Sequence, residues 1–171
     1  MADENPPAGE NPAQADGPAE GAQLRVLGQY VKDLSFENPN APDSLRAGGE
    51  APKIEVSVDV NARRISGDDF EVSLRCSASA QRGESASFIV ETVYAGLFQL
   101  SGAPADALQP ILLIECPRIL FPFARRIIAD ATRDGGFPPL MLDPIDFAAL
   151  YRRQLQAKEE EGQGAEPPTV N

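Results

Sequence analysis

The sequence contains no histidine, and it has only two cysteines among its 171 residues. The absence of histidine excludes Ser-His-Asp and Cys-His catalytic arrangements, and it also excludes metal sites that use histidine ligands. Cys76 and Cys116 are too few for a disulfide framework, and too few for a zinc site without histidine. Their sparsity suits a reducing compartment. We therefore expect no metal and no other cofactor.

The chain also lacks a basic stripe of the kind that nucleic-acid binding requires. Its formal net charge is −11, and most of the acidity lies near the two ends. Residues 1–23 hold five acidic residues and no basic one, and residues 156–171 carry a net −3, which leaves −3 for residues 24–155. We expect no nucleic-acid partner.

Long apolar runs are missing as well. Residues 1–23 have neither the basic start nor the apolar run of a secretory signal. The most apolar stretch, residues 110–124, is interrupted by Glu115, Pro117 and Arg118 and falls short of the roughly 18 residues of a membrane span. We expect a cytoplasmic protein with no direct membrane insertion.

Composition divides the chain into three segments. Alanine, glycine and proline supply thirteen of the first 23 residues, which together with the acidic charge predicts a disordered tail over residues 1–23. The acidic stretch 156–171 is interpreted in the same way. Residues 24–155 are predicted to form one folded domain.

Alternation of apolar and polar residues predicts four strands. The first runs from Leu24 to Glu37, and the others cover residues 54–60, 70–80 and 85–98. In the first strand, alternation assigns one face to Leu24, Val26, Tyr30, Leu34 and Phe36, and the other to Arg25, Gln29, Asp33, Ser35 and Glu37. Tight turns are expected at residues 67–69 and 81–84. Short connections favour an antiparallel sheet.

Helical spacing replaces the alternation from Asp106 to Arg133. Pro110, Pro117 and Pro122 are expected to kink or interrupt this helix, and Gly135-Gly136 to end it. Asp143 and Pro144 are expected to open a final helix that ends near Leu155. The predicted fold class is α+β, a four-stranded antiparallel sheet followed by a long kinked helix and a short C-terminal helix.

No catalytic arrangement stands out. Asp33 and Glu37 are the natural carboxylate pair, but four residues of strand separate them by roughly 13 Å, beyond the roughly 5–9.5 Å of glycosidase pairs. The sequence has no phosphate-binding glycine loop, nucleophile elbow or cluster with metal-ligand spacing. We expect no catalytic residue.

Two surfaces remain open to interpretation. The acids Asp33, Glu37 and Glu91, with Ile89 among them, form either a solvated sheet face or a docking site for a basic partner. The second set lies in or beside proline-rich sequence and on the short helix that follows it, and either completes the core or lines an exposed apolar groove: Phe36, Phe137, Leu140, Met141, Leu142, Phe147, Leu150 and Tyr151.

Four collinear segments resemble the SecB family of bacterial protein-export chaperones. They are YVKDLSFENPNAP (30–42), GLF (96–98), CPRILFPFAR (116–125) and GFPPLMLDPIDFAALY (136–151). The resemblance covers about residues 24–155. The N-terminal tail is longer than is usual for the family, and residues 90–94 depart from its commoner pattern near positions that take part in oligomer contacts.

The resemblance implies a homotetrameric chaperone, a dimer of dimers, that binds unfolded preproteins and passes them to SecA, the ATPase motor of the Sec translocase. It implies no cofactor or catalysis, because the zinc of this handover belongs to the C-terminal tail of SecA. By matching position, the SecA-binding residues are Asp33, Glu37, Ile89 and Glu91, and the client-binding groove includes Phe36, Phe137, Leu142 and Phe147. The alternatives are a chaperone dedicated to one partner, such as an antitoxin, and, third, an enzyme on the same fold.

Overall fold

The computed structural model describes residues 21–46 and 51–163, with side chains described up to residue 157. Its strands are β1 (Gln23–Glu37), β2 (Lys53–Ser66), β3 (Asp69–Arg82) and β4 (Ser85–Ser101). Its helices are η1 (Asp43–Leu45), α1 (Ala105–Pro110), η2 (Ile111–Glu115), α2 (Cys116–Asp134) and α3 (Phe147–Gln163). The strands form one antiparallel sheet in the order β1-β4-β3-β2, which confirms the predicted fold class.

Both predicted hairpin turns are confirmed. Two residues, Gly67 and Asp68, separate β2 from β3, and Gly83 and Glu84 separate β3 from β4. Gly67 and Gly83 adopt φ values of 51° and 60°, a backbone region that glycine enters without steric cost. These short turns set the antiparallel register of the three strands.

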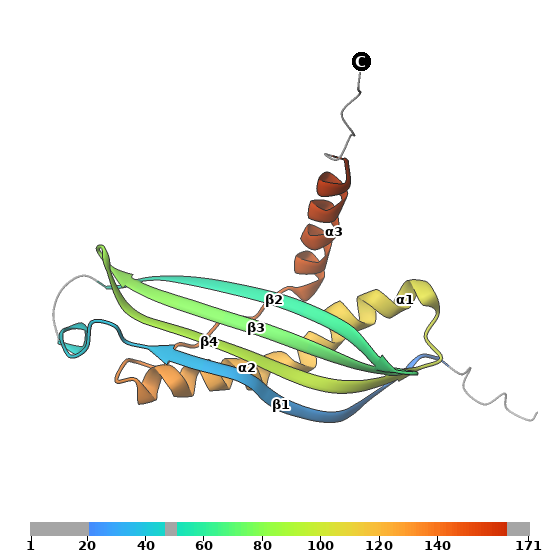
Figure 1. Ribbon diagram of the computed structural model, residues 1–171, viewed down its shortest axis with the longest axis horizontal. Coiled ribbons are helices and arrows are strands. Elements are labelled where there is room, and N and C mark those ends of the chain that lie inside the picture. The colour runs from blue at the N-terminus through green and yellow to red at the C-terminus, as the bar shows by residue number, and fades with distance from the viewer. Residues whose placement is uncertain (1–20, 47–50, 164–171) are drawn as a thin grey trace, which may run out of the picture.

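A helical layer covers one face of the sheet, here called the inner face, and the opposite, outer face is open (Figure 1). α2 packs mainly on β4 and β3. Leu74 and Phe98 on the strands and Leu120 and Ile128 on α2 are fully buried between the two layers. α3 projects away from the sheet on the β2 side (Figure 1).

The long helix changes its hydrogen-bonding type and does not break. α1, η2 and α2 follow one another without a gap, and η2 is a π-helical segment that starts directly after Pro110. Proline supplies no backbone N–H, and a π segment is one of the ways in which a helix accommodates such a loss. Pro117 and Pro122 also lie within this continuous helix, where each removes one backbone donor.

The helix over residues 105–134 passes a length and hydropathy test for a membrane span, because an 18-residue window within it has a mean hydropathy of 1.3. Its packing supplies another reason for that composition. Leu112, Cys116, Leu120, Ala124 and Ile128 belong to the hydrophobic core that the helix shares with the sheet.

The predicted faces of β1 are wrong in the middle of the strand. Register shifts between Val26 and Gly28 and between Val31 and Asp33 reverse the alternation over the residues between them. Tyr30 lies opposite Ala95 and points to the outer face, whereas Gln29 lies opposite Gly96 and points to the inner face. After the second shift the predicted assignment holds again through Glu37.

The final helix begins later and ends later than the sequence pattern suggested. Asp146, and not Asp143, directly precedes the helix. Its carboxylate accepts a hydrogen bond of 2.9 Å from the backbone N–H of Ala149, as the side chain of an N-cap residue does. This bond lowers the pKa of Asp146. The helix continues to Gln163, past Leu155. Most of the two predicted tails, residues 1–20 and 164–171, lies outside the described residues.

Candidate functional site

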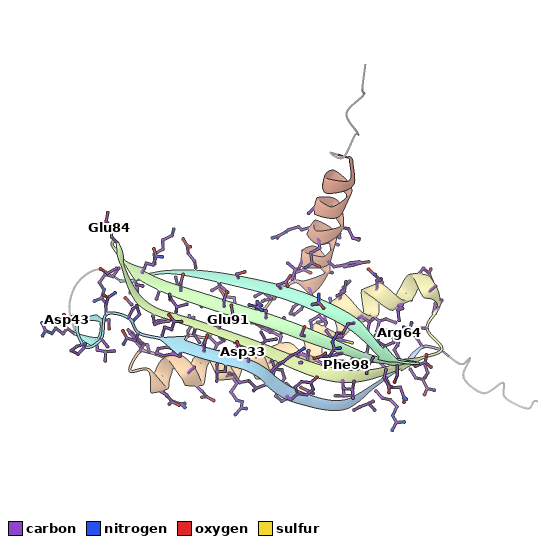
Figure 2. The ribbon with its side chains drawn as sticks, in the orientation of Figure 1. Asp33, Asp43, Arg64, Glu84, Glu91 and Phe98 are labelled. Carbon is purple, nitrogen blue, oxygen red and sulfur yellow. The ribbon has the colours of Figure 1, made fainter. Side chains whose placement is uncertain are left out.

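The outer face of the sheet brings together the four residues predicted to bind SecA. β1 and β4 are neighbours, and their register sets Asp33 opposite Val93, Ser35 opposite Glu91 and Glu37 opposite Ile89. Directly opposed residues share a face, so the three acids and Ile89 form one patch, the acidic patch. Figure 2 shows Asp33 and Glu91 on the two adjacent strands.

Charges inside this patch are unevenly matched. Arg75 of β3 donates a hydrogen bond of 2.6 Å to Glu91 Oε1. With the residues that the structure describes, Asp33 and Glu37 form no ion pair. Both side chains are exposed, as is Ile89. The patch therefore presents unpaired carboxylates beside an apolar side chain, which is suited to a partner that is basic and partly apolar.

A buried carboxylate lies next to the acidic patch. Glu71 of β3 is only 3% exposed, and it accepts hydrogen bonds from Tyr30 (3.0 Å), from Lys32 (2.7 Å) and from Arg63. The Lys32 ammonium is the main cause of a lowered pKa of Glu71, and burial followed by the Glu71 hydrogen bond raises the pKa of Tyr30. Alternation alone missed this network, because it placed Tyr30 on the opposite face.

Beside the network, the outer face is hollowed between the strands. The hollow has a volume of about 460 Å³ and is lined by Lys32, Asp33, Asp59, Asn61, Ser73, Arg75 and Val93. Its lining is largely polar and charged. One acid of the patch, Asp33, and the cation paired with another, Arg75, thus face the same space.

On the inner face, two of the residues predicted to bind clients meet in an aromatic cluster. Phe36, Phe88 and Phe137 pack with ring centroids 4.9–6.4 Å apart. A Cβ atom built on Gly135 would lie 2.1 Å from the Phe36 ring, so the end of α2 lies directly against that ring. Phe36 and Phe137 remain half-buried, and half-exposed Leu45 of η1 lies nearby against Gly136.

The other two predicted residues belong to the core of this chain. Leu142 is 4% exposed and Phe147 is 1% exposed, and the Phe147 ring packs edge-on against Phe121 at 5.9 Å. For these two residues the geometry matches the alternative that they complete the core. Because both side chains are buried, a bound client would contact the exposed residues around Leu142 and Phe147 and not these two side chains directly.

Those neighbours form a groove along the β2 edge, here called the edge groove. It has a volume of about 580 Å³ and is lined by residues of β2, of the 140–145 loop and of α3, among them Ile54, Val56, Met141, Leu142 and Leu150. Ile54, Val56 and Met141 are exposed large apolar side chains. The alternation along residues 54–60 puts Ile54 and Val56 on one face of the strand, but it does not indicate that no other element covers them.

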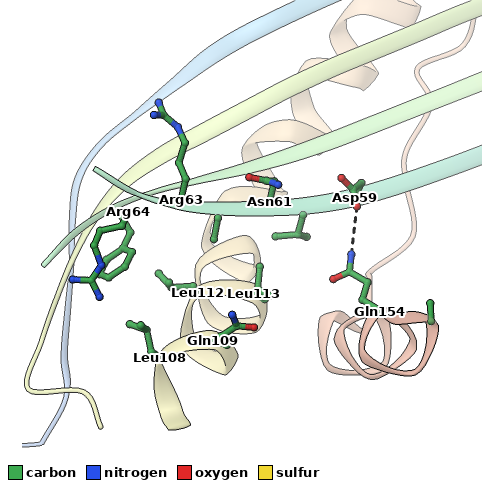
Figure 3. A pocket seen from close by; sticks show the side chains of 13 residues that line it. Asp59, Asn61, Arg63, Arg64, Leu108, Gln109, Leu112, Leu113 and Gln154 are labelled. Carbon is green, nitrogen blue, oxygen red and sulfur yellow. Dashed lines mark hydrogen bonds between the residues drawn. The ribbon is translucent and has the colours of Figure 1, made fainter. Parts of the chain in front are cut away.

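A second hollow of about 540 Å³ lies further along β2 (Figure 3). Leu108, Leu112 and Leu113 line it from the long helix, and Gln154 lines it from α3, where it hydrogen-bonds Asp59 at 3.3 Å. Arg64 closes against Phe70, with its guanidinium 4.6 Å from the ring centroid. No local sequence pattern indicates this hollow, because it depends on where α3 lies.

Neither cysteine is available for chemistry. Cys76 and Cys116 are fully buried, and burial raises the pKa of each thiol to about 12, so neither is a thiolate at neutral pH. Among the described residues, no group of three or more Cys, Asp and Glu side chains is placed to hold a metal ion.

Comparison with known proteins identifies close relatives over most of the chain. A family model described as preprotein translocase subunit SecB matches residues 17–158. A protein-export protein SecB of Maricaulis maris is 60% identical over 148 residues, covering 86% of each chain. The protein of the same name from Parvibaculum lavamentivorans is 53% identical over 167 residues, covering 98% of this chain and 99% of its own.

Among solved structures, a SecB-like chaperone of Mycobacterium tuberculosis in complex with an antitoxin peptide has a similar fold. The TM-score is 0.60 at 15% sequence identity, and the match covers 71% of this chain and 90% of that one. At this level of identity the likeness concerns the fold alone.

Proposed function

We propose that this chain, which belongs to the SecB family of protein-export chaperones, holds precursor proteins unfolded in the cytoplasm and delivers them to SecA, the ATPase motor of the Sec translocase. Members of this family are chaperones and not enzymes, and they bind unfolded preproteins. The observation that carries the proposal is 60% identity to an export chaperone over 86% of each chain.

Client binding is assigned to the apolar surfaces of the inner face. The aromatic cluster with Phe36 and Phe137 and the edge groove lined by Leu142 offer apolar area to extended segments, whereas Phe147 is buried in the core. Burial of such area requires no particular side-chain sequence, so many precursors fit one surface. Exposed Ile54, Val56 and Met141 are the first side chains that a client would cover.

A charged residue in the edge groove should weaken client binding. Ile54→Asp is expected to weaken the affinity for an unfolded, reduced precursor by about tenfold, because it replaces apolar contact area with a carboxylate. Titration of a fluorescently labelled precursor measures this. Ile65→Asp is the matched control, since both isoleucines lie on β2 and are 43% and 46% exposed, but Ile65 is outside the groove. Equal weakening by the two variants would contradict the assignment of the groove.

SecA binding is assigned to the acidic patch of Asp33, Glu37 and Glu91 with Ile89. Opposite charge speeds the encounter with the basic, zinc-folded tail of SecA and gives it orientation. Glu91→Lys or Asp33→Lys is expected to abolish SecA binding in calorimetry while client binding remains. Glu55→Lys, which changes an exposed acid on β2, serves as the control for charge alone. SecA affinity equal to that of the parent in Glu91→Lys and Asp33→Lys would contradict this assignment.

Assembly into a homotetramer, a dimer of dimers, is the third part of the proposal. β1 is an edge strand, and it carries five exposed large apolar or aromatic residues: Val26, Leu27, Tyr30, Val31 and Leu34. An open strand edge with apolar side chains favours contact with a second copy of the chain.

A chaperone dedicated to a single partner is the competing function, and the antitoxin peptide bound by the M. tuberculosis neighbour is the reason to test it. The range of clients separates the two. Tight binding of one peptide, with several unrelated unfolded proteins ignored, would favour the dedicated chaperone. Comparable binding of several unfolded precursors favours the export role.

A further inference from the structure

Among the described residues, Arg75 is the cation that forms an ion pair with the acidic patch. It lies on β3 opposite Val93 of β4, while Glu91 lies opposite Ser77, so the two side chains are diagonal neighbours on the outer face. The 2.6 Å contact joins Arg75 Nη1 to Glu91 Oε1. Their side chains are 55% and 30% exposed, so the pair is within reach of an incoming partner.

Three other cations of this face are engaged elsewhere. Lys32 and Arg63 both bond Glu71, which is almost completely buried. Lys53 pairs with Glu55 at 2.7 Å on β2, at the other edge of the sheet from β1. Arg75 differs from these three in holding a carboxylate that the proposed partner also needs.

We propose, on the premise of the SecA-docking function above, that Arg75 is an internal competitor that lowers the affinity of the acidic patch for its basic partner. A lysine or arginine of the partner has to take Glu91 away from Arg75, so one ion pair is exchanged for another and none is gained. The positive charge of Arg75 also repels the partner's cations. Binding is thereby kept reversible, as a carrier that must release its partner requires.

The 460 Å³ hollow on the outer face can accommodate the guanidinium of Arg75 after the partner has displaced it from Glu91. Arg75 lines this hollow together with Asp33 and Asp59. When the partner occupies Glu91 and Asp33, the carboxylate of Asp59, which lies opposite Arg75 on β2, remains beside the guanidinium, so Arg75 keeps a neighbouring negative charge. Exposed ion pairs contribute little net stability, and the competition is therefore weak enough for a partner with several cations to win.

The test measures the affinity of the full-length chain for purified SecA, and for a peptide of the zinc-folded C-terminal tail of SecA, by calorimetry at low and high salt. Arg75→Gln is expected to bind about three- to fivefold more tightly at low salt, and the gain should shrink at about 0.5 M salt, where charges are screened. Arg75→Lys keeps the charge and should stay within about twofold of the parent. Lys53→Gln is the matched control, because it removes one positive charge from the same face at a pair outside the patch.

Each outcome decides a different point. If the parent binds SecA and Arg75→Gln binds equally or more weakly, the competitor role is overturned while the docking acids stand. Equal tightening by Lys53→Gln also overturns it, since net charge alone would then explain the gain. If the parent does not bind SecA, the docking function fails, and the role of Arg75 fails with it. Circular dichroism melting of each variant establishes that it is folded.

Discussion

Among single residues, Glu71 occupies the most demanding environment of the outer face. Its carboxylate is almost completely buried, and its three donors come from β1 and β2, the two edge strands of the sheet. Tyr30 and Lys32 reach it across β4, where fully buried Ala95 lies opposite both Tyr30 and Ser73. A small side chain at Ala95 leaves room for that crossing. Glu71 thus ties both edges of the sheet to β3.

Neutralising Glu71 should therefore destabilise the protein. Glu71→Gln is expected to lower the free energy of unfolding by about 1–3 kcal/mol at pH 7, because Lys32 and Arg63 lose their common anion. The pKa of Glu71 is depressed in the folded state, so its stabilisation is present above the unfolded pKa and is lost as the pH falls through the lower, folded value. Urea unfolding at one protein concentration should show the difference between variant and parent at pH 7 and a smaller one near pH 3.

Glu84→Gln is the control for this experiment, since Glu84 is an exposed residue of the β3–β4 turn (Figure 2). It should leave the free energy of unfolding unchanged at both pH values. A difference between Glu71→Gln and the parent that persists undiminished at pH 3 would mean that the charge of Glu71 does not stabilise the fold.

At the scale of elements, the Gly96-Leu97-Phe98 segment of β4 shows why a small residue is needed under the long helix. A Cβ atom on Gly96 would lie 2.6 Å from Phe98 Cε2 and 2.9 Å from Leu120 Cδ2, and both of those side chains are fully buried. The Phe98 ring therefore occupies the space above Gly96, and Leu120 of α2 closes over it.

Gly96→Ala should destabilise the protein by about 1–3 kcal/mol, since overpacking forces buried side chains out of their preferred rotamers. Thermal unfolding measures the effect. Gly28→Ala is the matched control, because Gly28 is also a strand glycine with negative φ and an added Cβ there meets nothing within 4 Å. A melting temperature equally low in both variants would indicate an effect common to both strand glycines and not a clash at Gly96.

Local patterns predicted the elements but not the details that depend on tertiary contacts. Alternation and the Gly67 and Gly83 turns were sufficient for the sheet, because each signal lies within a few residues. The two shifts in β1 carry no such signal, and they turn Tyr30 toward Glu71. The start of α3 was misplaced because Asp143 and Asp146 are both plausible caps, and only the hydrogen bond to Ala149 distinguishes them.

The candidate site was predictable to a similar degree. Strand parity and the family resemblance together predicted that Asp33, Glu37, Ile89 and Glu91 would share a face, because each lies outside the shifted part of β1. The arginine on Glu91, the carboxylate network and the edge groove require knowledge of which strands are neighbours. Burial of Leu142 and Phe147 likewise depends on how the 140–145 loop folds back onto the core.

For the whole molecule, the width of the sheet explains its exposed apolar surface. A helix with its side chains is about 10–12 Å wide, whereas four strands about 4.8 Å apart span roughly 14 Å between their outer axes. α2 packs mainly on β4 and β3, so parts of the inner faces of the two edge strands are left uncovered (Figure 1). Val31 and Leu34 on β1 and Ile54 and Val56 on β2 are exposed for this reason. A single chain thus has two open apolar edges, one proposed for assembly and the other for clients.

Charged residues introduced on the β1 edge should accordingly lower the number of chains in the proposed assembly and leave the fold of each chain intact. The parent is expected near 73 kDa, four chains of 18.3 kDa, in light scattering. The double variant Val31→Lys with Leu34→Lys should give a smaller species, because both side chains are exposed in the single chain and lysines there oppose contact between copies. Ile65→Lys, on β2, should keep the parental mass. A parent of 18.3 kDa, or a double variant of unchanged mass, would contradict assembly through β1.

The same variants test whether a client binds to one edge groove or to several grooves of an assembly at once. A long unfolded precursor can occupy more than one groove of an assembly, which raises its affinity without any new contact, whereas a short peptide occupies one. Smaller assemblies should therefore bind the precursor more weakly and the short peptide as before. If both affinities fall together, the substitutions have damaged the groove itself, and the β1 edge would then be part of the client surface.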